Sequence, residues 1–409
     1  MSSPRSADGA GAPRGVAVIG STGSIGRQAL DVLAANAGAF RVVALAAGSN
    51  AQLLEEQVRR FHPAAIALAS ATGPSRLDLA PGVEDRSGDA DALIALATRG
   101  DVALVVVGTS GIVSLRPVLA ALEAGKVVAT ANKETLVAGG HLVMPIAARL
   151  AGAASEPAMR SSLAWLRPVD SEHSAIWQCL AGEGSGSIGR LLLTASGGPF
   201  LDGPLDLSTV TPAMALRHPT WRMGPKITID SATLANKGLE VIEAHWLYDV
   251  GYDAIDVVIH PQSVVHSAVV FVDGSLKAQL GTPDMRLPIQ YALTYPQRRP
   301  SPTAAPDLAA IGRLDFSVPD EGRFPALRIA REAGRKGPRA SAALIAADEV
   351  AVGRFLEGSL DFTAIPRLLE AAVERYGASG REAPGPDELL ALDAEVRRAF
   401  AAGPIGTVA

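Results

Sequence analysis

Val16-Ala17-Val18-Ile19-Gly20-Ser21-Thr22-Gly23-Ser24-Ile25-Gly26 decides the fold of this chain. The apolar residues 16–19 predict a buried strand, and the stretch from Arg27 to Leu33 predicts a helix. Glycines between a strand and a helix let the backbone turn sharply and approach a pyrophosphate, which the free amides of the helix then bind. The spacing is G-x-x-G-x-x-G rather than G-x-G-x-x-G, so the motif alone is weak. Its setting favours a dinucleotide-binding turn over a purely structural one.

Short apolar runs and helical stretches alternate around this motif from residue 15 to residue 130. Further strands are expected at 41–46, 64–69, 102–107 and 126–130. This alternation predicts βαβ units and a parallel sheet with helices on both faces. The fold class is therefore α/β, beginning with a Rossmann-type domain.

The pattern changes after about residue 165, which predicts a second domain of the α+β type. Its expected elements are a strand at 190–194, a helix at 231–247 and strands at 256–260, 264–272 and 275–280. Asp273-Gly274 between the last two strands predicts a hairpin. Residues 295–307 carry four prolines and read as an extended linker, and a small bundle of helices is expected beyond it.

Composition narrows the classes of function. The 409 residues exceed one compact core, and the net charge of -5 gives no basic field for nucleic acid. The chain has one cysteine, Cys179, so an internal disulfide and a cysteine-based zinc site are excluded. Cys179 lies in an apolar segment, which indicates a buried residue. No apolar run is expected to span a membrane, and residues 1–13 lack the apolar core of a signal peptide, so we expect a cytoplasmic protein.

The end of the second strand indicates which dinucleotide binds. NAD sites usually place an acid there for the ribose hydroxyl, but this chain has Gly48-Ser49-Asn50. An acid would repel a 2′-phosphate, whereas Ser and Asn can bond one, so NADP is favoured. Arg59 and Arg60 either assist or are solvated helix residues.

Three acids of the second domain form a candidate metal site. Asp170 and Glu172 stand at a strand-to-helix junction, and Glu240 lies in the helix expected at 231–247. Three carboxylates suit Mg²⁺ or Mn²⁺. Taken singly, Asp170 also fits a helix N-cap, and Glu240 fits an ion pair with Lys237.

Candidate anion-binding groups are denser in this domain. Ser196-Gly197-Gly198 follows a strand and predicts a nest of backbone amides. Ser231 is expected at a helix start, with Asn236 and Lys237 one to two turns later. Residues 216–225, which include His218, mix aromatic, basic and turn residues and are typical of a lid, although each feature also fits a surface loop.

Asn132-Lys133-Glu134 follows the strand expected at 126–130 and so falls at the carboxyl edge of the sheet, where open α/β folds bind ligands. A lysine there can reach both cofactor and substrate, and the alternative is an ordinary helix start with a surface lysine. His260 and His266 lie in a strand region and are expected to be structural.

Together these segments resemble the 1-deoxy-D-xylulose 5-phosphate reductoisomerase family, the NADPH enzymes of the non-mevalonate isoprenoid route. The matching segments, in chain order, are Gly20–Gly26, Ala131–Thr135, Pro168–Ser174, Ser196–Phe200, His218–Trp221, Asp230–Thr233 and Asn236–Glu240. They span most of the chain and are specific as a set.

The resemblance implies a role for each candidate residue. Thr22, Gly23, Ser24, Ile25, Gly48, Ser49, Asn50, Asn132, Glu134 and Gly224 would contact NADPH. Asp170, Glu172 and Glu240 would bind Mn²⁺ or Mg²⁺, with Co²⁺ as a further option. Ser171, Glu172, Ser196, His218, Ser231, Asn236, Lys237 and Glu240 would bind the substrate, and Lys133 and Glu172 would be the catalytic residues. Whether Glu172 also relays protons stays open.

The resemblance also implies an architecture and a reaction. We expect a homodimer with a disordered tail at 1–13, an NADPH-binding domain at 14–166, a catalytic and dimerisation domain at 167–294, a linker at 295–320 and a C-terminal helical domain at 321–409. The family rearranges a phosphorylated ketose by retro-aldol and aldol steps and reduces the branched aldehyde to 2-C-methyl-D-erythritol 4-phosphate. No nucleic acid or membrane partner is expected.

Two departures from the family pattern and three rival functions remain. Residues 152–165 are longer than usual in the family, and Leu201 stands where an arginine is usual. One rival is a semialdehyde-type dehydrogenase, which would need Cys179 as nucleophile. The others are a different NADP-dependent oxidoreductase of a phosphorylated sugar and a non-catalytic NADPH-binding regulator.

Overall fold

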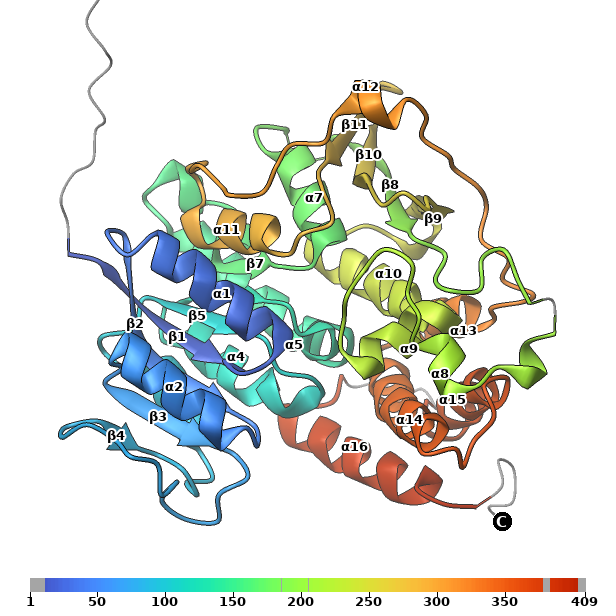
Figure 1. The fold of residues 1–409 in the computed structure, drawn as a ribbon. Helices are drawn as coiled ribbons and strands as arrows, with labels where there is room; N and C mark the ends of the chain where they lie inside the picture. Colours follow the sequence, from blue (N-terminus) through green and yellow to red (C-terminus); the bar gives the residue numbers. More distant parts are fainter. Residues whose placement is uncertain (1–11, 185, 205, 378–382, 404–409) are drawn as a thin grey trace, which may run out of the picture.

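The computed structural model describes residues 12–184, 186–204, 206–377 and 383–403. The tail predicted at 1–13 therefore lies outside the described residues except for Ala12 and Pro13. A seven-stranded parallel sheet forms the N-terminal part, in the order β4-β3-β2-β1-β5-β6-β7 (Figure 1). Its strands are β1 (Arg14–Ile19), β2 (Phe40–Ala47), β3 (Ala65–Leu68), β4 (Glu84–Asp85), β5 (Leu104–Val107), β6 (Val127–Thr130) and β7 (Leu166–Pro168).

The strand order confirms the predicted Rossmann-type domain. From β1 the chain builds β2 and β3 on one side and then β5, β6 and β7 on the other, which makes β1 and β5 the topological switch point. Every strand is parallel to its neighbours, so the loops after β1, β2, β5, β6 and β7 all lie at the carboxyl edge. Ligands of open α/β sheets bind at this edge.

Five helices connect these strands. They are α1 (Ser24–Ala35), α2 (Ala51–Phe61), α3 (Ala92–Thr98), α4 (Leu115–Glu123) and α5 (Lys133–Ala153). The extra residues at 152–165 form the end of α5, a 3₁₀ turn (Pro157–Met159) and the short helix α6 (Ser162–Trp165), which lead into β7. The domain boundary predicted at 166 falls inside β7, because this strand pairs with β6 and belongs to the first sheet.

A second sheet of four strands forms the middle of the chain, in the order β11-β10-β8-β9. Its strands are β8 (Ile188–Ala195), β9 (Ile255–Ile259), β10 (Val265–Phe271) and β11 (Leu276–Leu280). β10 and β11 are antiparallel across Asp273-Gly274, which confirms the predicted hairpin, and β8 and β9 are parallel. Helix α7 (Ser171–Leu180) packs on β10 and β11.

The helix predicted over 231–247 is instead two helices, α9 (Pro225–Thr233) and α10 (Ala235–Tyr248). Leu234 between them adopts φ 60°, a left-handed conformation that ends one helix and turns the chain into the next. Ser231 consequently lies in the last turn of α9 and not at a helix start, which corrects the sequence prediction. The phosphate-site candidates Ser231 and Asn236 lie on either side of this turn, in α9 and α10.

A group of helices closes the chain, as predicted. After α11 (Arg286–Thr294) and an irregular passage containing the short α12 (Leu308–Ile311), the chain forms α13 (Ala326–Lys336), α14 (Pro338–Leu356), α15 (Ala364–Tyr376) and α16 (Pro386–Phe400). Helix α14 packs against α13, α15 and α16, and also against α5 of the N-terminal part (Figure 1). The C-terminal helices therefore support a helix that begins at the dinucleotide edge.

Within the described residues, α5 alone is long and apolar enough to cross a membrane by length and composition. The expectation that no apolar stretch reaches this length is therefore wrong. Helix α5 packs against α4, α10 and α14, and it opens with the buried polar residues Lys133, Glu134 and Thr135. Packing against these helices explains why α5 is apolar, because it is a central helix of the protein.

Candidate functional site

Close backbone contacts explain the glycines after β1. Gly20 adopts φ 86°, and a Cβ there would lie 2.7 Å from the carbonyl carbon of Gly108. A Cβ on Gly26 would lie 2.2 Å from the oxygen of Gly20. Helix α1 can thus begin at Ser24 directly over the edge of the sheet, where the amides of its first turn have no acceptors within the helix. The geometry is that of an anion-binding helix start.

The predicted 2′-phosphate residues Gly48, Ser49 and Asn50 are exposed at the carboxyl end of β2. Asn50 is the N-cap of α2, and its Oδ1 accepts from the amide of Leu53 at 3.0 Å. Arg59 and Arg60 lie at the opposite end of this helix, where Arg59 pairs with Glu55 and Arg60 with Asp31. Of the two interpretations of these arginines, the structure favours ordinary helix residues.

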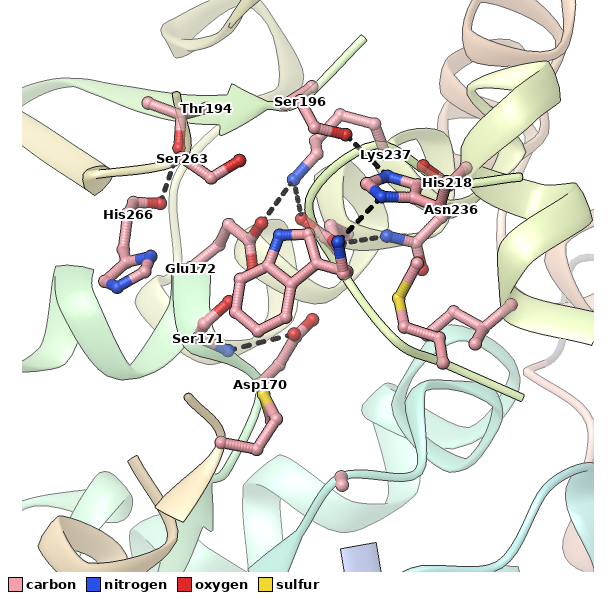
Figure 2. Close-up of a pocket in the computed structure, with 18 of the residues that line it drawn as sticks. Asp170, Ser171, Glu172, Thr194, Ser196, His218, Asn236, Lys237, Ser263 and His266 are labelled. Carbon is pink, nitrogen blue, oxygen red and sulfur yellow. Dashed lines mark hydrogen bonds and ion pairs between the residues drawn. The ribbon is translucent and has the colours of Figure 1, made fainter. Parts of the chain in front are cut away.

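A cavity of about 170 Å³ is lined by residues from both parts of the chain, and Figure 2 shows many of them. The dinucleotide turn contributes Ser24 and Ile25 to its wall, and Ala131 and Lys133 come from the end of β6 and the start of α5. The second sheet and its helices supply most of the remaining polar lining: Asp170, Ser171, Glu172, Thr194, Ser196, His218, Ser231, Asn236, Lys237, Glu240, Ser263 and His266. One cavity therefore joins the predicted metal and substrate residues with three of the predicted cofactor residues, Ser24, Ile25 and Gly224.

The three predicted metal ligands converge at this cavity. Asp170 caps α7 by accepting from the amide of Ser171 at 3.0 Å, and Glu172 lies in the first turn of the same helix. Glu240 reaches them from α10 and is completely buried. One oxygen from each carboxylate lies within 4.8 Å of the others. The cap and metal interpretations of Asp170 are thus compatible.

Two lysines lie among these acids. The ammonium of Lys133 contacts Asp170 and lies 3.5 Å from Glu240, and that of Lys237 lies 3.0 Å from Glu172 and 2.5 Å from Glu240. Burial disfavours the charge of Lys133, but attraction to Asp170, Glu240 and Glu243 outweighs it and raises the pKa of the lysine well above its usual value. Burial and the charge of Glu172 raise the pKa of Glu240 to about 7.

The chemistry of this donor set fits a divalent cation. Three carboxylates provide hard oxygen ligands, and the ammonium groups now between them show that positive charge is stabilised there. Burial is the main cause that raises the pKa of Glu240, and the negative charges of Glu172 and Asp170 add to it. A cation would relieve this excess of negative charge.

Sequence reasoning missed a second layer of this site. His173, on α7, places Nε2 3.3 Å from Glu243, which lies on α10 one turn after Glu240. Both side chains are buried, and with Asp170 they form a second group of possible ligands within 4.8 Å. His173 follows Asp170 by three residues, and Glu243 follows Glu240 by three residues. Residues at this spacing share a helix face, so the sequence could have indicated this second group.

The residues predicted to bind phosphate lie where β8 meets α9 and α10. Gly197 and Gly198 adopt φ 86° and 69°, and a Cβ on Gly198 would lie 2.8 Å from the carbonyl oxygen of Ser231. This contact brings the Ser196–Gly198 nest against Ser231. Asn236 and Lys237 follow the turn at Leu234 and line the same end of the cavity. Figure 2 shows Lys237 pointing toward Glu172, and His218 beside Ser196.

Residues 216–225, the lid segment, border the cavity rather than a packed core. His218, Trp221, Met223 and Gly224 line the cavity, and the indole centre of Trp221 lies 6.3 Å from the ring of His266. His266 is thus a lining residue as well as a structural one, whereas His260 is tied to the amide of Val264 and the carbonyl of Asp315. Sequence alone did not distinguish the two histidines.

The three residues after β6 have different surroundings. Lys133 reaches the carboxylates, and Glu134 is buried with its Oε1 3.8 Å from Lys226. The side chain of Asn132 caps α5 through Thr135 and donates to the carbonyls of Thr109 and Gly111. Both of its side-chain N–H groups are therefore already used, and its backbone N–H donates to the hydroxyl of Thr130 at 3.1 Å.

The remaining sequence expectations concern Cys179 and Leu201. Cys179 is buried, and burial raises the pKa of its thiol to about 11, so it is not a reactive nucleophile. This removes the basis for a dehydrogenase with a thiol nucleophile. Leu201 is half-buried against Gly197, and its carbonyl accepts from Arg323 at 3.3 Å.

Comparison with known proteins agrees with this arrangement. The 1-deoxy-D-xylulose 5-phosphate reductoisomerase model matches residues 16–140, that family's C-terminal domain model matches 166–248, and the DXP reductoisomerase C-terminal domain model matches 280–399. The 1-deoxy-D-xylulose 5-phosphate reductoisomerase of Pelotomaculum thermopropionicum is 49% identical over 384 residues, which cover 93% of this chain and 96% of the relative. That of Symbiobacterium thermophilum is 50% identical and covers 96% and 99%.

Two crystal structures superpose over most of the chain. The reductoisomerase of Zymomonas mobilis in complex with NADPH has a TM-score of 0.84 at 37% identity and covers 95% of this chain and 98% of its own. A DOX-P reductoisomerase in complex with NADPH, fosmidomycin and magnesium has a TM-score of 0.85 at 37% identity, covering 95% and 97%. With these matches over nearly its whole length, the chain belongs to the 1-deoxy-D-xylulose 5-phosphate reductoisomerase family.

Proposed function

We propose that this chain converts 1-deoxy-D-xylulose 5-phosphate to 2-C-methyl-D-erythritol 4-phosphate, using NADPH and a divalent cation, in isoprenoid biosynthesis. The observation that carries the proposal is the convergence of Asp170, Glu172 and Glu240 within 4.8 Å in the cavity that the dinucleotide turn also lines. The overall reaction is a skeletal rearrangement followed by transfer of one hydride. The protein is therefore an oxidoreductase that also isomerises.

Asp170, Glu172 and Glu240 would hold Mg²⁺ or Mn²⁺. When bound, the cation supplies Lewis acidity toward a carbonyl and its neighbouring hydroxyl, and NADPH supplies the hydride. Lys133 stays charged between these acids and would donate to an oxygen of the reacting carbons. The hydroxyl of Ser171 donates to Glu172 at 2.5 Å, so this pair can exchange a proton with a substrate hydroxyl beside it.

The substrate phosphate would bind at the end of the cavity formed by β8, α9 and α10. Ser196, Ser231, Asn236 and Lys237 supply hydroxyl, amide and ammonium donors there, and Gly197 and Gly198 adopt the positive φ angles typical of an anion-binding nest. His218 would complete this end from the lid segment. Holding the phosphate away from the reacting carbons provides binding energy for their orientation.

NADPH would lie across the carboxyl edge of the parallel sheet. Its pyrophosphate would meet Thr22 and Gly23 of the turn after β1 and Ser24 and Ile25 at the start of α1. Its 2′-phosphate would meet Gly48, Ser49 and Asn50. The nicotinamide end would extend toward Asn132, Glu134 and Gly224, with Ile25 and Ala131 forming apolar walls of the cavity. This path runs from exposed residues at β2 to buried ones at α5.

We further propose that the enzyme is a cytoplasmic homodimer built through its middle domain. The β10–β11 hairpin supports this, since β11 is an edge strand whose outer backbone groups lack a strand partner among the described residues. Val272 and Leu276 on the hairpin are 71% and 56% exposed. The proposed parts are the NADPH domain, the catalytic and dimerisation domain, the linker and the C-terminal helices.

The activity is tested by mixing the protein with NADPH, Mg²⁺ or Mn²⁺ and 1-deoxy-D-xylulose 5-phosphate and following absorbance of the reduced nicotinamide. We expect oxidation of NADPH only when all components are present, with 2-C-methyl-D-erythritol 4-phosphate as the product by mass spectrometry. Tight NADPH binding without turnover would favour a regulator instead. Turnover of other phosphorylated sugars but not of this one would indicate a different reductase.

A further inference from the structure

A second buried charge cluster lies outside the proposed metal site. Lys226, in the first turn of α9, places its ammonium 2.7 Å from Asp230, 2.7 Å from Asp348 and 3.8 Å from Glu134. Asp230 and Asp348 are 2% and 1% exposed. Buried charges are retained at a cost unless they are well paired, so this group calls for an explanation beyond general stability.

The ammonium of Lys226 pairs with carboxylates from three parts of the molecule. Glu134 belongs to α5 at the dinucleotide edge, Asp230 to α9, and Asp348 to α14 of the C-terminal helices. Lys226 is also the first residue after the lid segment, and the hydroxyl of Thr228 donates to the carbonyl of Gly224 at 2.8 Å. The end of the lid segment is therefore fastened where the three parts meet.

The charges in this cluster make Lys226 hard to replace. One ammonium faces three carboxylates, and the Oδ1 atoms of Asp230 and Asp348 are buried without a hydrogen-bond donor. Burial and the charge of Asp348 raise the pKa of Asp230 well above its usual value despite the ammonium beside it. Removing the lysine would leave three carboxylates facing one another directly after the lid segment.

A neighbouring acid extends the connection to the cofactor edge. Glu349 follows Asp348 on α14, pairs with Arg397 of α16 at 2.7 Å, and lies 2.9 Å from the position a Cβ would take on Gly111. The carbonyl of Gly111 in turn accepts from Asn132 at 2.9 Å. Helix α14 thus contacts both Lys226, directly after the lid segment, and Gly111 in the loop after β5.

We propose that Lys226 is a positioning residue that fastens the lid segment to α5 and α14, so that the C-terminal helices hold the lid in register with the dinucleotide edge. The expected change in KM rests on the proposed function, whereas the expected change in hydrogen exchange does not. This role of Lys226 gives the C-terminal helices a part in the reaction although, in the part of the chain that the structure describes, none of their residues lines the cavity.

The test compares Lys226→Met, Lys226→Arg and Lys336→Met, the last being an exposed lysine at the end of α13. Hydrogen exchange is measured without substrate or cofactor, so its outcome does not depend on the activity. We expect Lys226→Met to speed exchange at 219–225 by about tenfold or more, while α9 and α14 stay protected and the melting temperature falls by only a few degrees. Lys226→Arg should restore most protection, and Lys336→Met should match the wild type.

The kinetic arm uses the same proteins with metal and NADPH present. Lys226→Met should raise KM for the sugar phosphate by about tenfold with a smaller change in kcat, because the lid segment contributes to binding. If Lys226→Met does not fold, Lys226→Met/Asp348→Asn removes one charge of each sign and should fold with the lid still loosened. Unchanged exchange at 219–225, or an equal rise throughout α9 and α14, would overturn the proposal.

Discussion

The Nε2 atom of His218 lies 3.0 Å from the hydroxyl oxygen of Ser196, which links the lid segment to the glycine nest after β8. The other ring nitrogen, Nδ1, accepts from the amides of Thr220 and Trp221 at 3.1 and 2.9 Å. An accepting Nδ1 requires the neutral ring with its proton on Nε2, which then donates to Ser196. One side chain thus shapes the lid segment and attaches it to the proposed phosphate site.

This arrangement predicts that acid loosens the lid segment. Burial lowers the pKa of His218, so the folded segment favours the neutral ring and an opened segment binds the proton more readily. The contribution of His218 to lid stability is therefore present at neutral pH and lost as the pH falls through and below about 6.5. Exchange protection of 219–225, corrected for intrinsic rates, should fall over this range in the wild type. In His218→Gln this pH dependence should be absent, and an identical profile in both proteins would refute it.

The exposed end of β2 predicts a preference for NADPH. Asn50→Asp keeps an oxygen for the N-cap of α2, so the variant changes charge without removing the cap. The new carboxylate should repel a 2′-phosphate and weaken NADPH by about tenfold or more, while NADH is nearly unaffected. Titration of both dinucleotides measures this, with Arg59→Ala as a control because Arg59 pairs with Glu55. Equal use of NADPH and NADH by the wild type would contradict the assignment.

Removal of single carboxylates should separate metal-dependent chemistry from cofactor binding. Asp170→Asn, Glu172→Gln and Glu240→Gln each remove one charged oxygen ligand, and each should lower kcat/KM by about 100-fold or more. NADPH affinity should survive, and high metal concentration should restore part of the activity. Glu357→Gln, a change at an exposed acid after α14, should have no effect. Full activity of the wild type in EDTA would refute the metal site.

The strand and helix patterns were sufficient to predict the domain types, because buried parallel strands and turn glycines leave local signals. The break at Leu234 could not be predicted, since an apolar residue carries no sign that tertiary packing will hold it at φ 60°. The same break moved Ser231 from an expected helix start to the last turn of α9. Ser231 and Asn236 nevertheless line the same cavity.

Long-range pairing limited the sequence prediction of the site. Asp170 and Glu240 were singled out as hard oxygen ligands, but the ammonium of Lys133 between them comes from another domain, and only folding shows the contact. His173 and Glu243 were missed because a buried histidine and a helical acid are ordinary residues until their side chains meet. The family resemblance supplied the roles, and the structure supplies the distances.

We expect the two subunits to meet at the exposed β10–β11 hairpin. Val272 and Leu276 are the exposed apolar residues of β10–β11, and a two-stranded edge of this kind is stabilised by further packing. Sedimentation at micromolar concentration should give a dimer for the wild type. Leu276→Asp should shift it toward monomer, whereas Val113→Asp, at an equally exposed residue far along the chain, should not. A wild-type monomer would contradict the proposal.

Trp221 should contribute most of the lid's binding energy. It is half-buried at the cavity wall and lies near His266, although its segment has no regular secondary structure and is bounded by Pro219, Gly224 and Pro225. A substrate beneath it would bury more of the indole and keep water from the reacting carbons. Truncation removes this apolar contact but no part of the packed core.

Trp221→Ala is therefore expected to raise KM for the sugar phosphate by about 10- to 100-fold, with the melting temperature almost unchanged. Trp177→Ala is the matched control, because Trp177 is 4% exposed and packs against Tyr291, so its loss should lower stability instead. Hydrogen exchange with and without the sugar phosphate, in the absence of NADPH so that no turnover occurs, distinguishes a moving lid from a static loop. Amides of 216–225 should gain protection when the sugar phosphate binds, and equal protection in both states would show that the segment does not close.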